Sequence, residues 1–356
     1  MQEFTDVDLN LKISESKVYC KYCRLPCNDE EILIGYHKYC FNILNDYVIN
    51  YLRIDSLTEN EHNFLVDLTK NVEFTLKISS LYKPGVNVVI SDNHITEVHL
   101  RYYQHQQLPE SIISLENLEI LEIHKGNLSK LPEAIQKCSK LEIITIIRNI
   151  ITKIPDSIGN LDKLVHLDLS FNKIGYITKK IGKLQNLELL NLSNNPLESI
   201  PLEIGNLFNL KEILLNNLII LLEIPNTMIN LTNLKKLSIN NSNLELIPPW
   251  VYYLSLLEEL DLGNNIIDQI SPEIALLANL KRINIENNKI AFLPASIGSL
   301  SFLEVLLLRN NKITKLPKAM KKLKQLSYLE LIFNPLKESN KFWRDRKIIT
   351  EYLANL

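Results

Sequence analysis

The sequence lacks the features that would place it among membrane proteins, common enzymes or nucleic-acid-binding proteins. No apolar run reaches the roughly 18 residues that a membrane-spanning helix needs, and the acidic, polar start MQEFTDVDLNLK is unlike a secretory signal. The motifs GxxxxGK(S/T), GxGxxG, HExxH and GxSxG are missing. A pI of 6.4, without interleaved aromatic and basic residues, disfavours nucleic-acid binding. We therefore expect a non-enzymatic protein with no membrane span.

Cysteine is scarce, with five residues in a chain of 356. Four of them fall within residues 20–40, and such a cluster is more typical of a metal site in a reducing compartment than of disulfides. We therefore expect a cytoplasmic protein. The fifth, Cys138, lies at an inward position of the repeat described next. A small buried hydrophobe is the better interpretation of Cys138 than a nucleophile.

What the sequence has in abundance is a leucine repeat. The stretch LVHLDLSFNKIGYITKKIGKLQNL begins at Leu164, and the same pattern begins again at Leu187. Each step between units is 23 residues except the 24 that follow Leu210, where the irregular run LLNNLIILLEIP occurs. A fixed period in this range indicates a solenoid. Eleven units fill residues 95–336, beginning at Ile95, Leu118, Leu141, Leu164, Leu187, Leu210, Leu234, Leu257, Leu280, Leu303 and Leu326.

Each recurring residue type has a physical task. An apolar pair such as Leu167 and Leu169 alternates with period two and predicts a short strand with one buried face. Proline after the second apolar cluster, Pro201 for example, fixes φ as the chain turns along the convex side. Asparagine at the ninth position, such as Asn195, can donate its amide to turn carbonyls of neighbouring coils. Four units depart from this asparagine, at Tyr103, Gly126, Leu218 and Ser242, so we expect a weaker ladder early in the array and around Leu218.

The pattern LxxLxLxxNxLxxIPxxIxxLxx resembles the leucine-rich repeat. Its proline makes it similar to the subclass found in intracellular Ras-group-related and Scribble-type signalling proteins. The resemblance implies an α/β fold: a curved leucine-rich-repeat solenoid of about 11 repeats of 23 residues. It also implies that binding residues lie on the concave sheet, at the strand positions between the leucines.

Residues 20–40, CKYCRLPCNDEEILIGYHKYC, hold two short-spaced pairs of candidate metal ligands. Cys20 and Cys23 form a CxxC knuckle, and His37 and Cys40 form an HxxC pair after it. Two such pairs can fold back on one ion, and the order of elements resembles treble-clef and LIM-type zinc modules. This predicts a structural Zn²⁺ with a closed Cys₃His set, for which Cys27 is a possible substitute ligand. The alternative is a reduced cysteine cluster without metal.

The rest of the chain predicts a connector and caps. We divide the whole chain into a tail (1–17), a zinc-binding module (18–52), a helical connector with an N-terminal cap hairpin (53–94), the solenoid (95–336) and a C-terminal capping helix (337–356). Thr58 and Glu61 fit a capping box, and Asp92 with Asn93 fits a hairpin turn. A partner-binding arm is the alternative for residues 41–71. The C-terminal helix should bury the stripe Ile348, Ile349, Tyr352 and Leu353.

Two zones of the expected concave face carry basic, aromatic or apolar residues, as contact surfaces do. The N-terminal zone comprises His99, Arg101, His124, Lys125, Ile143, Ile147, Arg148, His166 and Phe171. The C-terminal zone, which could instead pack beneath the last helix, comprises Val305, Leu307, Arg309, Tyr328, Ile332 and Phe333. We favour the N-terminal zone as the binding surface, because no segment is expected to cover it.

These observations predict a monomeric scaffold whose concave face binds another protein. The family resemblance makes small-GTPase signalling a candidate context. The alternative is an accessory or substrate-recognition subunit of an enzyme complex, for example in ubiquitin transfer, recruited through the zinc module. Residues 305–347 hold twelve Lys and Arg against three acids, which we interpret as a solvated flank or, alternatively, a docking end.

Overall fold

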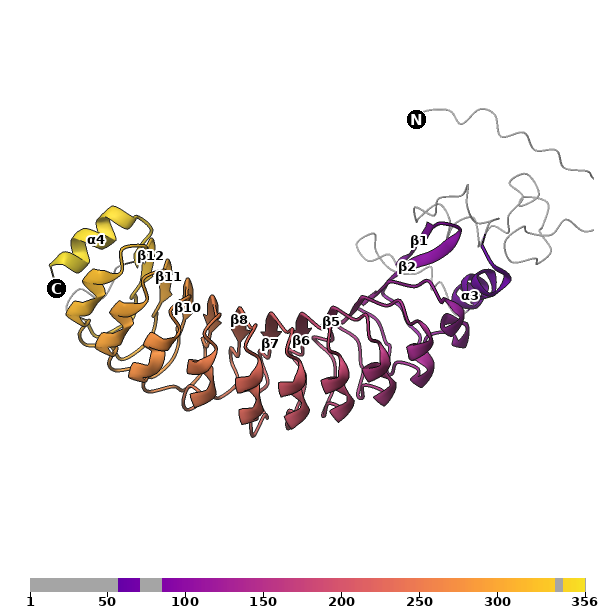
Figure 1. Cartoon of the computed structure of the whole chain (residues 1–356), viewed down its shortest axis with the longest axis horizontal. Helices are drawn as coiled ribbons and strands as arrows, with labels where there is room; N and C mark the ends of the chain where they lie inside the picture. Colours follow the sequence, from indigo (N-terminus) through magenta and orange to yellow (C-terminus); the bar gives the residue numbers. More distant parts are fainter. Residues whose placement is uncertain (1–56, 71–84, 337–341, 356) are drawn as a thin grey trace, which may run out of the picture.

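A computed structural model describes residues 57–70, 85–336 and 342–355. The chain forms a curved solenoid in which one sheet lines the inner side of the arc and a row of 3-10 helices lines the outer side (Figure 1). The predicted zinc ligands and residues 1–56 lie outside the described residues. The described chain therefore carries the candidate interaction surface and both of its flanking caps.

The sheet has 13 strands that neighbour one another in sequence order. Strands β2 to β12 are parallel, one for each of the eleven predicted units, and each register pairs a residue with its equivalent one unit later, as Leu167 with Leu190. The leucine spacing therefore predicted the register correctly. The strands are β1 (Gly85–Ser91), β2 (His94–Arg101), β3 (Ile120–His124), β4 (Ile143–Ile147), β5 (His166–Asp168), β6 (Leu189–Asn191), β7 (Glu212–Leu214), β8 (Lys236–Ser238), β9 (Glu259–Asp261), β10 (Arg282–Asn284), β11 (Val305–Leu307), β12 (Tyr328–Glu330) and β13 (Phe342–Trp343).

The convex side is built from five-residue 3-10 helices. Most of them follow a proline whose φ lies near the helical value, as Pro201 does at −68° before η6. This is the turning role that the sequence predicted for proline, and Thr178 and Ser271 take the same place in two units. The helices are η2 (Glu110–Ser114), η3 (Glu133–Lys137), η4 (Asp156–Asn160), η5 (Lys179–Lys183), η6 (Leu202–Asn206), η7 (Asn226–Asn230), η8 (Pro249–Tyr253), η9 (Pro272–Leu276), η10 (Ala295–Ser299) and η11 (Lys318–Lys322).

The core is a continuous stack of leucine and isoleucine between the sheet and the helices. Leu167, Leu169 and Leu190 are fully buried, and their equivalents recur along the whole array. Burying such a side chain contributes roughly 1.5–3 kcal/mol. Each coil gains that contribution only against its neighbours, so the two ends of the stack require covers.

A ladder of buried asparagines joins successive coils. Asn172 donates from Nδ2 to Ile146 O (2.7 Å) and Leu169 O (2.9 Å), while its Oδ1 accepts from Ile151 N (3.1 Å). The predicted gap at Leu218 is present, since an apolar side chain fills that place. The predicted gap at Ser242 is only partial, because its Oγ lies 3.1 Å from Leu215 O.

Two further units show why asparagine is missing from them. A Cβ added at Gly126 would meet Asn149 Oδ1 at 2.7 Å, so the amide of the following unit occupies this space. Tyr103 is buried and donates from its hydroxyl to Gln107 O (2.9 Å). The asparagine ladder therefore begins at Asn149, as the sequence predicted for the early units.

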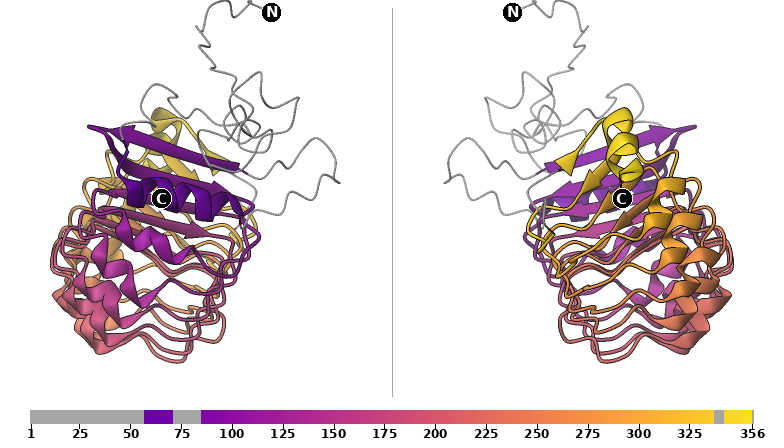
Figure 2. Two further views of the ribbon diagram at one scale, coloured as in Figure 1. Left: turned by 90° about the vertical axis from the view of Figure 1, so that its right-hand side faces the viewer. Right: turned by 90° about the vertical axis from the view of Figure 1, so that its left-hand side faces the viewer.

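The N-terminal end is covered by α3 (Glu59–Lys70) and by the β1–β2 hairpin (Figure 2). The predicted capping box is present, with Thr58 N donating to Glu61 Oε2 (2.9 Å) and Glu61 N donating to Thr58 Oγ1 (3.3 Å). Glu61 Oε1 also accepts from Ile95 N (2.8 Å), which ties the helix to β2. The hairpin turns at Asp92–Asn93, both with positive φ, as predicted.

The C-terminal end is covered by β13, which pairs antiparallel with β12, and by α4 (Arg346–Ala354). Asp345 caps α4 by accepting from Ile348 N (3.0 Å). Ile349 and Leu353 are buried as predicted, but Ile348 is 51% exposed, so the predicted apolar stripe was too wide. The sequence did not predict the strand β13.

Candidate interaction surface

The predicted N-terminal zone lies on the first four parallel strands and the turns that follow them. His99 and Arg101 are in β2, His124 ends β3, Ile143 and Ile147 begin and end β4, and His166 begins β5. The last three members, Lys125, Arg148 and Phe171, each follow the strand region of their unit and are exposed. The register of the parallel sheet therefore brings these nine residues together on adjacent strands.

Carboxylates that sequence reasoning missed hold the histidines of this zone. His99 lies between Glu97 (2.8 Å from Nε2) and Glu122 (2.9 Å from Nδ1), and His124 lies 3.7 Å from Glu122. Burial lowers the pKa of His99, but the hydrogen bonds with Glu122 and Glu97 outweigh burial and raise this pKa above its ordinary value. Protonated His99 therefore neutralises carboxylates of its own surface rather than presenting a free cation.

A backbone feature distinguishes the ends of the array from its middle. In each of the eleven units the residue at the eighth position of the repeat, one to three residues after the strand ends, has a positive φ, between 52° and 61°. Six central units place asparagine there: Asn194, Asn217, Asn241, Asn264, Asn287 and Asn310. The other five place bulkier side chains there: Tyr102, Lys125, Arg148, Phe171 and Phe333. Asparagine tolerates this conformation, whereas aromatic and long basic side chains adopt it at a conformational cost.

These bulkier side chains pair across neighbouring units. Arg148 Cζ lies 5.0 Å from the ring centroid of Phe171, and Lys125 Nζ lies 5.6 Å from that of Tyr102. We call Arg101, Tyr102, Lys125, Arg148 and Phe171 the N-terminal rim. A cation over an aromatic face at an exposed site stabilises by about 0.5–1 kcal/mol. The rim therefore places two neighbouring cations, Lys125 and Arg148, between the aromatic rings of Tyr102 and Phe171.

In the middle of the array, exposed polar side chains form hydrogen bonds and ion pairs with one another. Asn287 donates to Asn264 Oδ1 (2.8 Å), and Asn310 donates to Asn287 Oδ1 (2.9 Å), so the exposed asparagines form a second ladder. Lys211 pairs with Glu188 and Lys281 with Glu258, each at 2.6 Å. The dipeptide Asn-Asn recurs in these units and is the sequence signal that could have predicted this second ladder.

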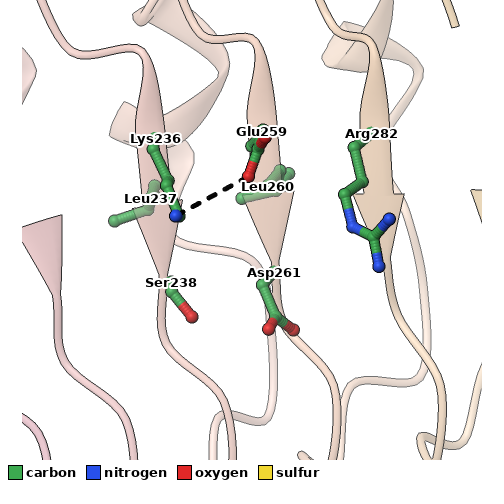
Figure 3. Close-up of a pocket in the computed structure, with 7 residues that line it drawn as sticks. All are labelled: Lys236, Leu237, Ser238, Glu259, Leu260, Asp261 and Arg282. Atoms are coloured by element: carbon green, nitrogen blue, oxygen red, sulfur yellow. Dashed lines mark ion pairs between the residues drawn. The ribbon is translucent and has the colours of Figure 1, made fainter. Parts of the chain in front are cut away.

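A small hollow on the concave face belongs to the same closed network (Figure 3). Lys236 bridges Glu212 (3.6 Å) and Glu259 (3.9 Å) beside it. Asp261 Oδ1 accepts from Asn284 Nδ2 (2.9 Å) and from the backbone of Gly263 (3.1 Å). Each carboxylate of the hollow therefore has an internal partner, and the Ser238 hydroxyl likewise donates to Asn216 Oδ1 (2.7 Å).

The predicted C-terminal zone is divided by the cap. Val305, Leu307, Tyr328 and Ile332 are half-buried, whereas Arg309 and Phe333 are exposed. Arg344, which follows β13, lies over the Tyr328 ring at 5.3 Å, and Arg309 lies over the Phe333 ring at 5.1 Å. Burial and the nearby Glu330 raise the pKa of Glu286, with Arg309 acting in the opposite direction. Arg309 of this zone therefore interacts with the carboxylate of Glu286.

The described residues provide no evidence for catalysis. Cys138 is buried, its Sγ lies 3.3 Å from Ile112 O, and burial raises its pKa to about 12, which confirms that it packs as a hydrophobe. Within residues 57–70, 85–336 and 342–355, no group of three or more His, Cys, Asp or Glu side chains could hold a metal ion. The helices of these segments are too short or too polar to cross a bilayer.

Comparison with known proteins agrees with this geometry. Family models described as leucine rich repeat match residues 116–174, 232–290 and 278–336, and a second such model matches residues 186–207. The chain belongs to the leucine-rich-repeat proteins. A search of curated proteins gives no match.

Solved leucine-rich-repeat structures resemble the chain over most of its length. An internalin from Listeria monocytogenes is 22% identical, with 68% of this chain and 76% of that chain covered and a TM-score of 0.55. The plant peptide hormone receptor RGFR1 in complex with RGF2 is 27% identical, with 68% and 44% covered and a TM-score of 0.51. The Arabidopsis receptor kinase HAESA, in complex with the peptide hormone IDA and the co-receptor SERK1, is 24% identical, with 78% and 54% covered and a TM-score of 0.62.

Proposed function

We propose that this leucine-rich-repeat protein is a non-enzymatic scaffold that binds another protein through its N-terminal rim. The observation that supports the proposal is the row of positive-φ residues. Six units of the same chain use asparagine at this place, so asparagine fits the fold here. The first four units use Tyr102, Lys125, Arg148 and Phe171 instead, at a conformational cost.

Residue type and exposure support the same surface. Arginine and aromatic side chains dominate the energetics of protein interfaces, and Phe171 is 44% exposed although Arg148 lies over its ring. Leucine-rich-repeat proteins generally act in protein–protein interaction, and the plant receptor above was solved in complex with RGF2. Small-GTPase signalling remains our candidate context, on the Scribble-type repeat pattern alone.

The zinc module and the cytoplasmic location also stay predictions. Cys20, Cys23, His37 and Cys40 would hold one structural Zn²⁺, with Cys27 as the possible substitute. Such a module, N-terminal to the rim, could recruit a second protein. Its spacing is also what favours the alternative function, an accessory subunit of an enzyme complex.

Capture with the full chain as bait tests the rim. The N-terminal variant replaces Tyr102, Lys125, Arg148 and Phe171 with asparagine, the residue that the central units use. The matched control, Phe333→Asn, makes the same exchange at the far end. We expect quantitative mass spectrometry to show specific partners lost from the N-terminal variant and retained by the control. Equal capture by both variants would reject this surface.

A further inference from the structure

The cations of the N-terminal rim differ in their partners from three paired lysines of the central units. Lys211, Lys236 and Lys281 each lie within 3.9 Å of a glutamate oxygen. Among the described residues, no carboxylate lies within ion-pair distance of Arg101, Lys125 or Arg148. The contacts of Lys125 and Arg148 are instead with the aromatic rings of Tyr102 and Phe171. Three adjacent cations are thus free to bind an external acid.

The acids of strands β2 to β5 are already occupied. Glu97 and Glu122 hold His99, as described above. Asp168 accepts from Ser170 N (2.9 Å) and from Asn191 Nδ2 (2.8 Å). These carboxylates lie on the strands, whereas Lys125 and Arg148 follow the strand ends. The rim therefore presents positive charge that its own surface does not satisfy.

We infer that the N-terminal rim receives an acidic, extended segment of a partner protein, an inference that rests on the function proposed above. Neighbouring parallel strands lie about 4.8 Å apart, so the rim cations recur at intervals that the side chains of an extended chain can reach. The aromatic rings that hold Lys125 and Arg148 keep each cationic head beside apolar surface, which strengthens its attraction for a carboxylate. The strands β2 to β5, which carry or precede the rim residues, line the inside of the arc, which an extended segment can enter and a flat bilayer cannot (Figure 1).

Binding of fluorescein-labelled poly-L-glutamate by the full chain tests the inference. The rim variant carries Arg101→Gln, Lys125→Gln and Arg148→Gln. The matched control removes the same charge from paired lysines, with Lys211→Gln, Lys236→Gln and Lys281→Gln. We expect the rim variant to bind about tenfold more weakly and the control to bind as the wild type does. Binding by the wild type should also weaken as salt is added.

Three results would overturn the inference: no binding of poly-L-glutamate by the wild type, equal weakening in both variants, or rim-dependent binding of phosphatidylserine vesicles in place of the peptide. The bait experiment separates this failure from failure of the proposed function. If asparagine at the rim abolishes partner capture while poly-L-glutamate does not bind, the rim still binds a protein, and only the acidic chemistry is wrong.

Discussion

The asparagine ladder predicts that two equivalent substitutions differ in their cost. Asn195 and Asn288 occupy the same place in their units and are both buried. Asn195 donates to Leu192 O and accepts from Ile174 N, each at 3.0 Å. Asn288 donates to the equivalent carbonyl, Ile285 O (3.2 Å), and accepts from Ile267 N (3.0 Å). Replacing either with alanine leaves one buried N–H without its acceptor.

The carbonyls differ, because they depend on the neighbouring units. Ile285 O also accepts from Asn311 Nδ2 of the next unit (2.8 Å), so it keeps a donor in Asn288→Ala. An asparagine in the next unit would donate to Leu192 O, but that unit has the apolar Leu218 at this position. An unsatisfied buried group costs about 1–3 kcal/mol. We therefore expect Asn288→Ala to cost about 1–3 kcal/mol and Asn195→Ala to cost about 1–3 kcal/mol more.

Equilibrium denaturation in urea measures both free energies of unfolding, with Leu190→Ala as the reference for lost packing, at about 2–5 kcal/mol. Hydrogen exchange locates the effect, since the amides of Ile174 and Ile267 should each lose protection in the corresponding variant. If the two asparagine variants lost equal stability, the account of the ladder as a chain of shared donors would be wrong.

Three further predictions follow from single sites. Gly182→Ala should cost about 1–3 kcal/mol of unfolding free energy, because the added Cβ would collide with Glu203 O. Gly175→Ala should be neutral, because the nearest atom to its added Cβ, Pro196 O, lies 3.9 Å away. Equal losses of stability in thermal unfolding would contradict this difference. The raised pKa of His99 means that its stabilisation is present below the ordinary value of 6.5 and is lost as pH rises through the folded pKa, so His99→Asn should flatten the fall in stability towards pH 8. Freshly reduced protein should contain about one equivalent of zinc, and Cys20→Ser should release it while the solenoid stays folded; elemental analysis without metal would remove the zinc site.

Much of the fold could be predicted because each coil repeats the same short sequence pattern and the same local structure. The period places Leu167 beside Leu190, the capping box of Thr58 and Glu61 starts a helix, and Asp92 supplies the first positive φ of the hairpin. Each of these signals is contained in a few adjacent residues or in a fixed offset. Register and cap position therefore need no knowledge of distant contacts.

The remaining features depend on contacts between units that residue type alone does not reveal. Glu122 reaches His99 from the neighbouring strand, so this histidine is not a free cation of the concave face. Ser242 maintains part of a ladder that asparagine would otherwise build. The positive φ of Arg148 and Phe171 is visible in the sequence only through comparison with the asparagines of other units. Candidate residues could thus be listed from the sequence, but their partners and backbone strain could not.

The stability and binding of one variant test most directly whether the rim is retained for binding at a conformational cost. Replacing the rim residues Tyr102, Lys125, Arg148 and Phe171 with asparagine relieves about 1 kcal/mol at each site and loses two cation–aromatic pairs at about 0.5–1 kcal/mol each. We predict that the unfolding free energy rises by about 2–3 kcal/mol while affinity for a captured partner is lost. A variant that is less stable than the wild type, or that still binds the partner, would contradict the account.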